Sequence, residues 1–67
     1  MRISYDVGHD LLYIYMMEGS RQVEPVNVNE DIAIDFDEKG RMAGIEVLSA
    51  SRYLDVASLM AVTVERS

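Results

Sequence analysis

Two runs of alternating apolar and polar residues flank a short polar turn, and they constrain the fold more than any other feature of the chain. Apolar residues recur at every second position in residues 32–36 and again in residues 42–48, which is the spacing of β-strands that bury one face. Gly40 stands in the turn between them and supplies the left-handed backbone that such turns need. The sequence therefore predicts a β-hairpin whose shared apolar face consists of Ile32, Ile34, Phe36, Ala43, Ile45 and Val47.

The register of this hairpin decides which face Glu46 takes. An even-length loop would set Ile34 opposite Ala43, whereas a slip of one residue would turn Glu46 toward the core. Glu46 is a candidate functional carboxylate, because it stands between apolar neighbours in a central strand. The structural interpretation, which we favour, is that it accepts local hydrogen bonds from the region of Ser49 and Ser51.

Three further strands are predicted on the N-terminal side. Residues 3–5 alternate and precede a turn, and residues 11–17 form an apolar run that is typical of a central strand covered on both faces. A second turn is predicted at residues 18–21. Residues 23–28 alternate as well, but Pro25 has no amide hydrogen, so this strand is expected at an edge or after the proline.

The C-terminal part predicts a helix and a last strand. Ser49 or Ser51 is expected to cap a helix of two or three turns, because residues 53–60 carry apolar side chains at helical spacing. Asp55 could cap a second short turn and divide this helix. Residues 61–65 alternate and are rich in β-branched side chains, which favours a strand.

From these elements we predict one α+β domain over residues 1–67: a meander-like antiparallel sheet of about five strands, with one C-terminal helix packed on a face. A domain this small buries only about 60% of the surface of its unfolded chain. It has no cysteine for a disulfide, yet 49% of its residues are hydrophobic. We therefore expect it to form a homodimer that shares its core.

The net charge of the chain limits the classes of molecule that it is expected to bind. Twelve acidic residues against six Lys and Arg give a net charge of −6. This balance argues against nucleic acid, which needs clustered cations, and favours a basic protein partner. No apolar stretch is long enough to span a membrane, and the N-terminus lacks the apolar run of a signal peptide, so we expect a cytoplasmic protein with no membrane association.

The polar residues offer only weak candidates for chemistry. Asp6, His9 and Asp10 could be imagined as a metal site, but three residues of one turn do not converge without help from elsewhere. Solvated turn residues are the better interpretation, with Asp6 and Asp10 closing the turn through bonds to the backbone. With no cysteine and one histidine, we expect no catalytic residues, no cofactor and no enzymatic activity.

Residues 35–46 also match part of a calcium-binding loop, because acidic residues and a glycine fall at its first, third, sixth and twelfth positions. Lys39 occupies the fifth position, where a ligand oxygen belongs, and the flanks alternate like strands rather than helices. A hairpin explains the stretch better than a calcium site.

Two blocks of residues resemble a small prokaryotic family, domain of unknown function 2283. The first block is Tyr5, Asp6, Asp10, Leu12, Tyr13 and Ile14. The second is Asp35, Asp37, Gly40, Arg41, Gly44, Ile45, Glu46, Leu48, Ala50 and Ser51. The chain departs from the family's pattern at His9 and Leu11, where small residues are usual, and at Ser49, where an acidic residue is common.

The resemblance implies no catalytic residues, because the family is uncharacterised. It implies an antitoxin-like partner of a basic protein, since small proteins of this kind resemble such partners in some gene neighbourhoods. We therefore expect a non-enzymatic interaction module that forms a homodimer and binds a basic protein. The alternative is a domain that binds a small ligand or metal through the Asp6, His9 and Asp10 turn or through Glu46.

Overall fold

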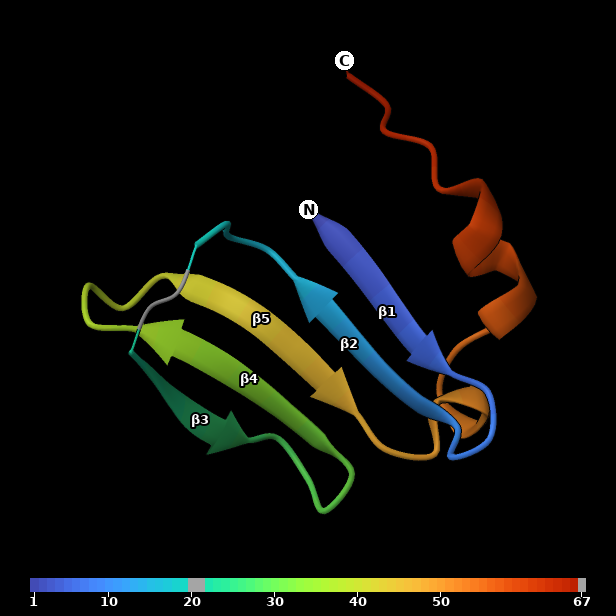
Figure 1. Cartoon of the computed structure of the whole chain (residues 1–67), viewed down its shortest axis with the longest axis horizontal. Helices are drawn as coiled ribbons and strands as arrows, with labels where there is room; N and C mark the ends of the chain where they lie inside the picture. The colour runs from blue at the N-terminus through green and yellow to red at the C-terminus, as the bar shows by residue number, and fades with distance from the viewer. Residues whose placement is uncertain (20–21, 67) are drawn as a thin grey trace.

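The computed structural model describes residues 1–19 and 22–66, and these residues form a five-stranded antiparallel sheet with two short 3-10 segments (Figure 1). The strands are β1 (Arg2–Asp6), β2 (Leu11–Tyr15), β3 (Val23–Asn27), β4 (Ile32–Asp37) and β5 (Met42–Val47). The 3-10 segments are η1 (Ala50–Arg52) and η2 (Val56–Ala61). The predicted antiparallel sheet of about five strands is confirmed.

The strand order is β1-β2-β5-β4-β3, so a hairpin and a three-stranded meander join through β2 and β5. This order places β1 and β3 at the two edges. Pro25 lies inside β3, as expected for a strand that needs no donors on its outer side. The turn predicted at residues 18–21 falls partly on Ser20 and Arg21, which lie outside the described residues.

The predicted hairpin of β4 and β5 is present, but its predicted register is wrong. Ile34 lies opposite Ile45 rather than Ala43. A bulge causes the difference, because Asp35 pairs with Gly44 while the next residue of β4 pairs with Met42, which leaves Ala43 between them. The pairing shifts by two positions, so the apolar residues still share a face and Glu46 still faces the other way.

The turn of this hairpin is held by one carboxylate. The Asp37 side chain accepts hydrogen bonds of 2.9 Å from the backbone amides of Lys39 and Arg41, and Arg41 Nε lies 3.1 Å from it. These amide bonds, that of Arg41 first, keep the pKa of Asp37 below its ordinary value. Gly40 has a φ of 77°, which confirms its predicted left-handed conformation.

The predicted C-terminal helix and last strand are both absent. Residues 50–61 instead form the two 3-10 segments, separated where Asp55 takes an extended conformation. Ser49 has a φ of 53° and makes no capping bond with its side chain, so the predicted cap is not formed. Residues 62–66 form no strand. The chain there leaves the sheet (Figure 1), and a strand needs a neighbouring edge for its hydrogen bonds.

One face of the sheet is apolar, and the strand registers divide it into two rows. The first, which we call the covered row, is Tyr5, Leu12, Val47 and Ile32. The second, which we call the isoleucine row, takes one residue from every strand: Ile3, Ile14, Ile45, Ile34 and Val26.

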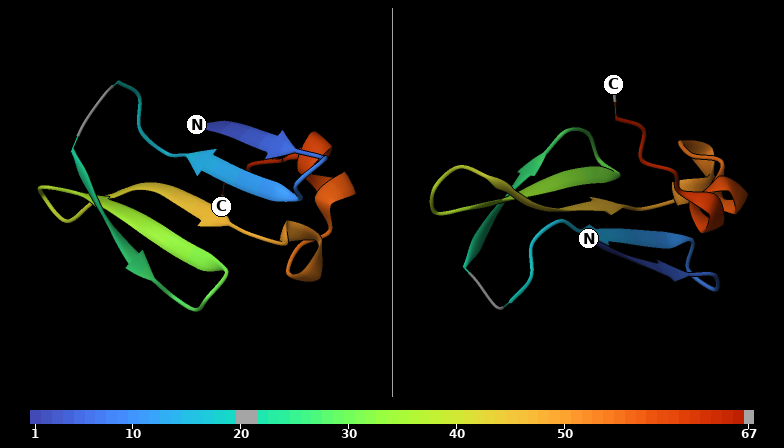
Figure 2. Two further views of the ribbon diagram at one scale, coloured as in Figure 1. Left: turned by 60° about the horizontal axis from the view of Figure 1, so that its bottom comes forward. Right: turned by 90° about the horizontal axis from the view of Figure 1, so that it is seen from above.

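The 3-10 segments lie mainly over the covered row, and η2 also borders the β1 end of the isoleucine row, where Ile3 lines a hollow with it. Leu12 is 0% exposed and Val47 is 4% exposed, and they pack with Ala50 of η1 and with Val56 and Leu59 of η2. Figure 2 shows that η1 and η2 gather at one end of the sheet and leave the rest without a second layer. The core of the domain therefore lies at that end.

Candidate functional site

The face opposite the apolar rows carries the polar groups of the central strands. Cross-strand pairing aligns Ser4, Tyr13, Glu46 and Ala33 in one row of this face. It aligns Arg2, Tyr15, Gly44 and Asp35 in the next row. We call this surface the tyrosine face.

The hydroxyl end of the Tyr13 ring occupies the space that a side chain at position 44 would take, and glycine leaves that space free. A Cβ atom on Gly44 would lie only 2.8 Å from Cε1 of Tyr13 and closer still to its hydroxyl. In this position the Tyr13 hydroxyl donates a hydrogen bond to the carboxylate of Asp35 on β4. That bond, with burial and the charge of Asp35, raises the pKa of Tyr13 to about 12. The Tyr13 hydroxyl therefore stays protonated at neutral pH and keeps its hydrogen bond to Asp35.

A second ring and a guanidinium continue this face. The rings of Tyr13 and Tyr15 have centroids 4.4 Å apart and an interplanar angle of 53°. The guanidinium carbon of Arg2 on the edge strand lies 3.9 Å from the centroid of Tyr15, which is a close cation-π contact. The chain thus already stacks one cation of its own on these rings.

Glu46 lies next to Tyr13 across the strands and is half-buried. The prediction that Glu46 accepts hydrogen bonds from the region of Ser49 and Ser51 is wrong, because Ser51 donates its hydrogen bond to Asp10 instead. Within the described residues the Glu46 carboxylate has no hydrogen bond or ion pair. It borders an open hollow of about 300 Å³ lined by Ser4, Asp6, Leu11, Tyr13, Tyr15 and Glu46.

The structure brings together only two residues of the predicted Asp6, His9 and Asp10 group. Nδ1 of His9 lies 2.8 Å from a carboxylate oxygen of Asp6, and both side chains are exposed. Asp10 turns away from them. Across residues 1–19 and 22–66 no three His, Asp or Glu side chains are grouped to hold a metal ion.

Asp10 has a different task, which sequence reasoning missed. Its carboxylate accepts hydrogen bonds of 2.6 Å from the hydroxyls of Tyr5 and Ser51, and its backbone oxygen accepts one of 2.9 Å from the amide of Ala50. Asp10 therefore fastens η1 to the β1–β2 hairpin. Asp10 and Ser51 are 41 residues apart, so they form no local sequence motif. The only signal in the sequence is that Tyr5, Asp10, Ala50 and Ser51 all belong to the two blocks that resemble the family.

This fastening predicts a pH dependence. The Ser51 hydroxyl, and then that of Tyr5, keeps the pKa of Asp10 below its ordinary value, so its contribution to stability is present above about pH 4 and is lost as the pH falls through the folded-state pKa. Asp10→Asn should lower stability at neutral pH and weaken the loss of stability on acidification, measured by urea unfolding at several pH values. Ser51→Ala should raise the pKa of Asp10 in an NMR titration, and an unchanged titration would contradict the assignment.

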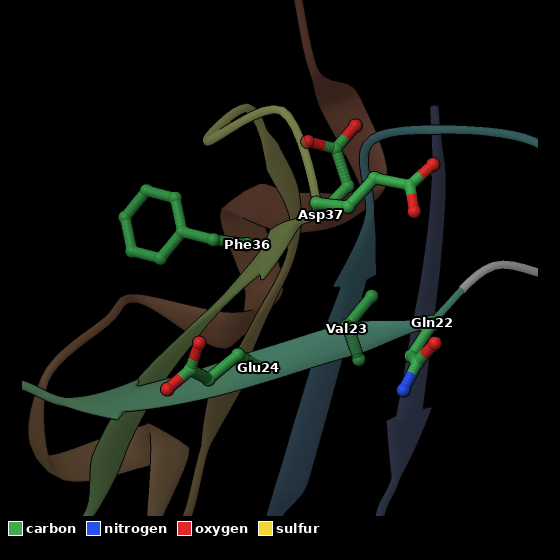
Figure 3. Close-up of a pocket in the computed structure, with 6 residues that line it drawn as sticks. Gln22, Val23, Glu24, Phe36 and Asp37 are labelled. Atoms are coloured by element: carbon green, nitrogen blue, oxygen red, sulfur yellow. The ribbon is translucent and has the colours of Figure 1, made fainter.

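Another open hollow, of about 470 Å³, lies where β3 begins and β4 ends, and it is lined by Gln22, Val23, Glu24, Phe36, Asp37 and Glu38. Figure 3 shows the Phe36 ring extending from β4 on the side of the Glu24 carboxylate and away from that of Asp37. Phe36 is half-buried and lies outside the buried cluster. It therefore extends the uncovered apolar surface beyond Ile34, two residues before it on β4.

Fold and surfaces together define a small domain built on one antiparallel sheet, with a partly covered apolar face and a tyrosine-bearing polar face. The chain belongs to the family described as Protein of unknown function (DUF2283), whose model matches residues 2–51. That match covers the whole sheet and ends at Ser51, the partner of Asp10. None of the described helical segments is long and apolar enough to cross a membrane.

A relative of the chain is the uncharacterized protein MJ0789 of Methanocaldococcus jannaschii, which is 41% identical over 56 residues. The aligned part is 84% of this chain and 47% of the relative, so the chain spans about half the length of that protein. No solved structure matches the chain significantly.

Proposed function

We propose that this protein is a non-enzymatic interaction module that pairs with a second copy of itself through the apolar face of its sheet. The observation that carries the proposal is the isoleucine row. Five aliphatic side chains, one from each strand, form this row; its isoleucines are half-buried, and the 3-10 segments lie mainly over the neighbouring row, with η2 reaching only the β1 end of this one among the described residues. Val26, at the β3 end of the row, is 51% exposed.

The total surface of the chain, to which the exposed segment after η2 also contributes, supports a second copy as the cover of the sheet. The chain exposes 5379 Å², whereas a compact monomer of 7.6 kDa exposes about 4,300 Å². The excess of roughly 1,100 Å² exceeds the ~800 Å² that each partner buries in an interface of standard size. The radius of gyration of 12.6 Å is also larger than the ~11 Å of a compact domain of this length. Two such sheets packed face to face would each supply the layer that the other lacks.

The charge of the chain supports a basic protein as the second partner. The net charge is −6, and a face-to-face dimer would leave both tyrosine faces outward. An antitoxin-like role, in which an acidic protein covers a basic one, fits this arrangement. The alternative of a metal or small-ligand site in the Asp6, His9 and Asp10 turn has less support, because the Asp10 carboxylate is already bonded to Tyr5 and Ser51.

Val26→Glu tests the dimer without disturbing the core of the monomer, because Val26 is half exposed at the end of the row. A carboxylate buried at a twofold interface should raise the dissociation constant about a hundredfold, or ~3 kcal/mol. Size-exclusion chromatography with light scattering should give twice 7.6 kDa for the unmodified chain and a single-chain mass for the variant.

The matched control is Val64→Glu, which adds the same charge at a residue that is 83% exposed in the C-terminal segment. This variant should remain a dimer. A monomeric unmodified chain at micromolar concentration, or dimers of Val26→Glu as tight as those of the control, would overturn the proposal.

A further inference from the structure

The tyrosine face already holds one guanidinium of the chain itself. Arg2 stacks on Tyr15 at 3.9 Å from the ring centroid. The ring of Tyr13 is the neighbour of Tyr15, and its hydroxyl end lies over Gly44. Since Tyr13 is only partly buried, it offers a second aromatic surface beside the one that Arg2 covers.

Acidic side chains outnumber basic ones around Tyr13. Asp6, Asp35 and Glu46 lie on this face, and Arg2 is the cation that pairing brings onto it among the described residues. The Asp35 carboxylate accepts from Tyr13, and that of Asp6 lies against His9. Glu46 has neither a hydrogen bond nor an ion pair within the described residues. It stands at the rim of the 300 Å³ hollow with the ring of Tyr13 beside it.

We infer that the tyrosine face binds an arginine side chain of a basic protein partner, with its guanidinium stacked on Tyr13 and hydrogen-bonded to the carboxylate of Glu46. The inference rests on the proposed function, because it names the surface and the chemical group through which the basic partner binds. A guanidinium is planar, weakly hydrated and able to donate two parallel hydrogen bonds to one carboxylate. The ammonium group of lysine carries the same charge, but it is not planar and cannot donate two parallel hydrogen bonds to one carboxylate.

The test is an NMR titration with a seven-residue peptide in which glycine alternates with three arginines. The expected result is a set of chemical-shift changes centred on Tyr13, Tyr15 and Glu46. Glu46→Gln keeps the shape of the side chain and should weaken binding at least about tenfold, because it removes a charge-assisted bond. Glu65→Gln is the matched control, since it removes the same charge from the exposed C-terminal segment, and it should weaken binding less than about twofold.

The arginine assignment would be overturned if the same peptide with lysines bound equally well, if both glutamate variants lost affinity equally, or if the shifts fell on the isoleucine row. Light scattering in the same buffer separates this inference from the dimer. A dimer that ignores the arginine peptide would overturn the inference alone. A monomer that binds the peptide through Tyr13 and Glu46 would overturn the dimer and support the inference.

Discussion

Replacing Leu12 by alanine is expected to lower the free energy of unfolding by about 2–5 kcal/mol. Leu12 is 0% exposed, lies in β2 between β1 and β5, and packs under Ala50. At about 0.05–0.15 kcal/mol per residue, the whole domain has only about 3–10 kcal/mol of stability. The variant should therefore be largely unfolded or close to unfolding at ambient temperature, measured by circular dichroism in a urea titration.

The control for this prediction is Leu54→Ala. Leu54 follows η1, is 38% exposed and lies outside the buried cluster, so the same change should cost less than about 1 kcal/mol. Equal losses in the two variants would show that the core does not lie between the sheet and η1.

Gly44→Ala is expected to disrupt the tyrosine face and to cost about 1–3 kcal/mol, as overpacking usually does. The new methyl group would overlap the Tyr13 ring, at 2.8 Å from Cε1, so the ring must swing away and lose its bond to Asp35. The pKa of Tyr13 should then fall from about 12 toward the ordinary value near 10. An ultraviolet titration of the folded protein measures this change.

The sign of the associated pH effect follows from the direction of the shift. Because the folded-state pKa is the higher one, the Tyr13–Asp35 bond contributes fully below about pH 10, and its contribution is lost as the pH rises toward 12. Gly44→Ala should show less of this alkaline loss in urea unfolding measured at a series of pH values.

Two further variants isolate the clash. Gly8→Ala should be nearly neutral, because the nearest atom to its new Cβ would be 3.5 Å away. Adding Gly44→Ala to a Tyr13→Ala background should cost little, since the ring that it meets is gone. A full loss in that background would mean that the backbone, and not Tyr13, requires glycine at this position.

The two faces of the sheet explain why so thin a domain is proposed to work as a pair. The covered row has a second layer of its own, made by Ala50, Val56 and Leu59. The isoleucine row crosses all five strands, and η2 reaches it only at the β1 end in the part of the chain that the structure describes. A second copy on this row would double the core and leave the tyrosine faces on opposite outer sides, each free for an arginine of the basic partner.

The candidate site was only partly within reach of the sequence. Glu46 stands out from its apolar neighbours, and the hairpin pattern assigns it to the face away from the core. The surroundings of Glu46 do not follow from the alternation of side chains. Tyr13 and Asp35 are 22 residues apart, and Gly44 contacts the Tyr13 ring only because β2 pairs with β5. The resemblance to the family pointed to Tyr13 and Gly44 without giving their relation.

Local side-chain patterns predicted the five observed strands, and alternation assigned their two faces, because a strand turns successive residues to opposite sides whatever it pairs with. The same alternation at residues 61–65 predicted a strand that does not form. The tertiary structure alone decided the register of β4 and β5, which depends on a bulge at Ala43. The tertiary structure also decided the conformation of the C-terminal part, which forms 3-10 segments instead of an α-helix. Residues 53–60 have helical spacing, but a short helix gains too little from its own hydrogen bonds. Asp10, far away in sequence, holds Ala50 and Ser51 in a 3-10 turn instead.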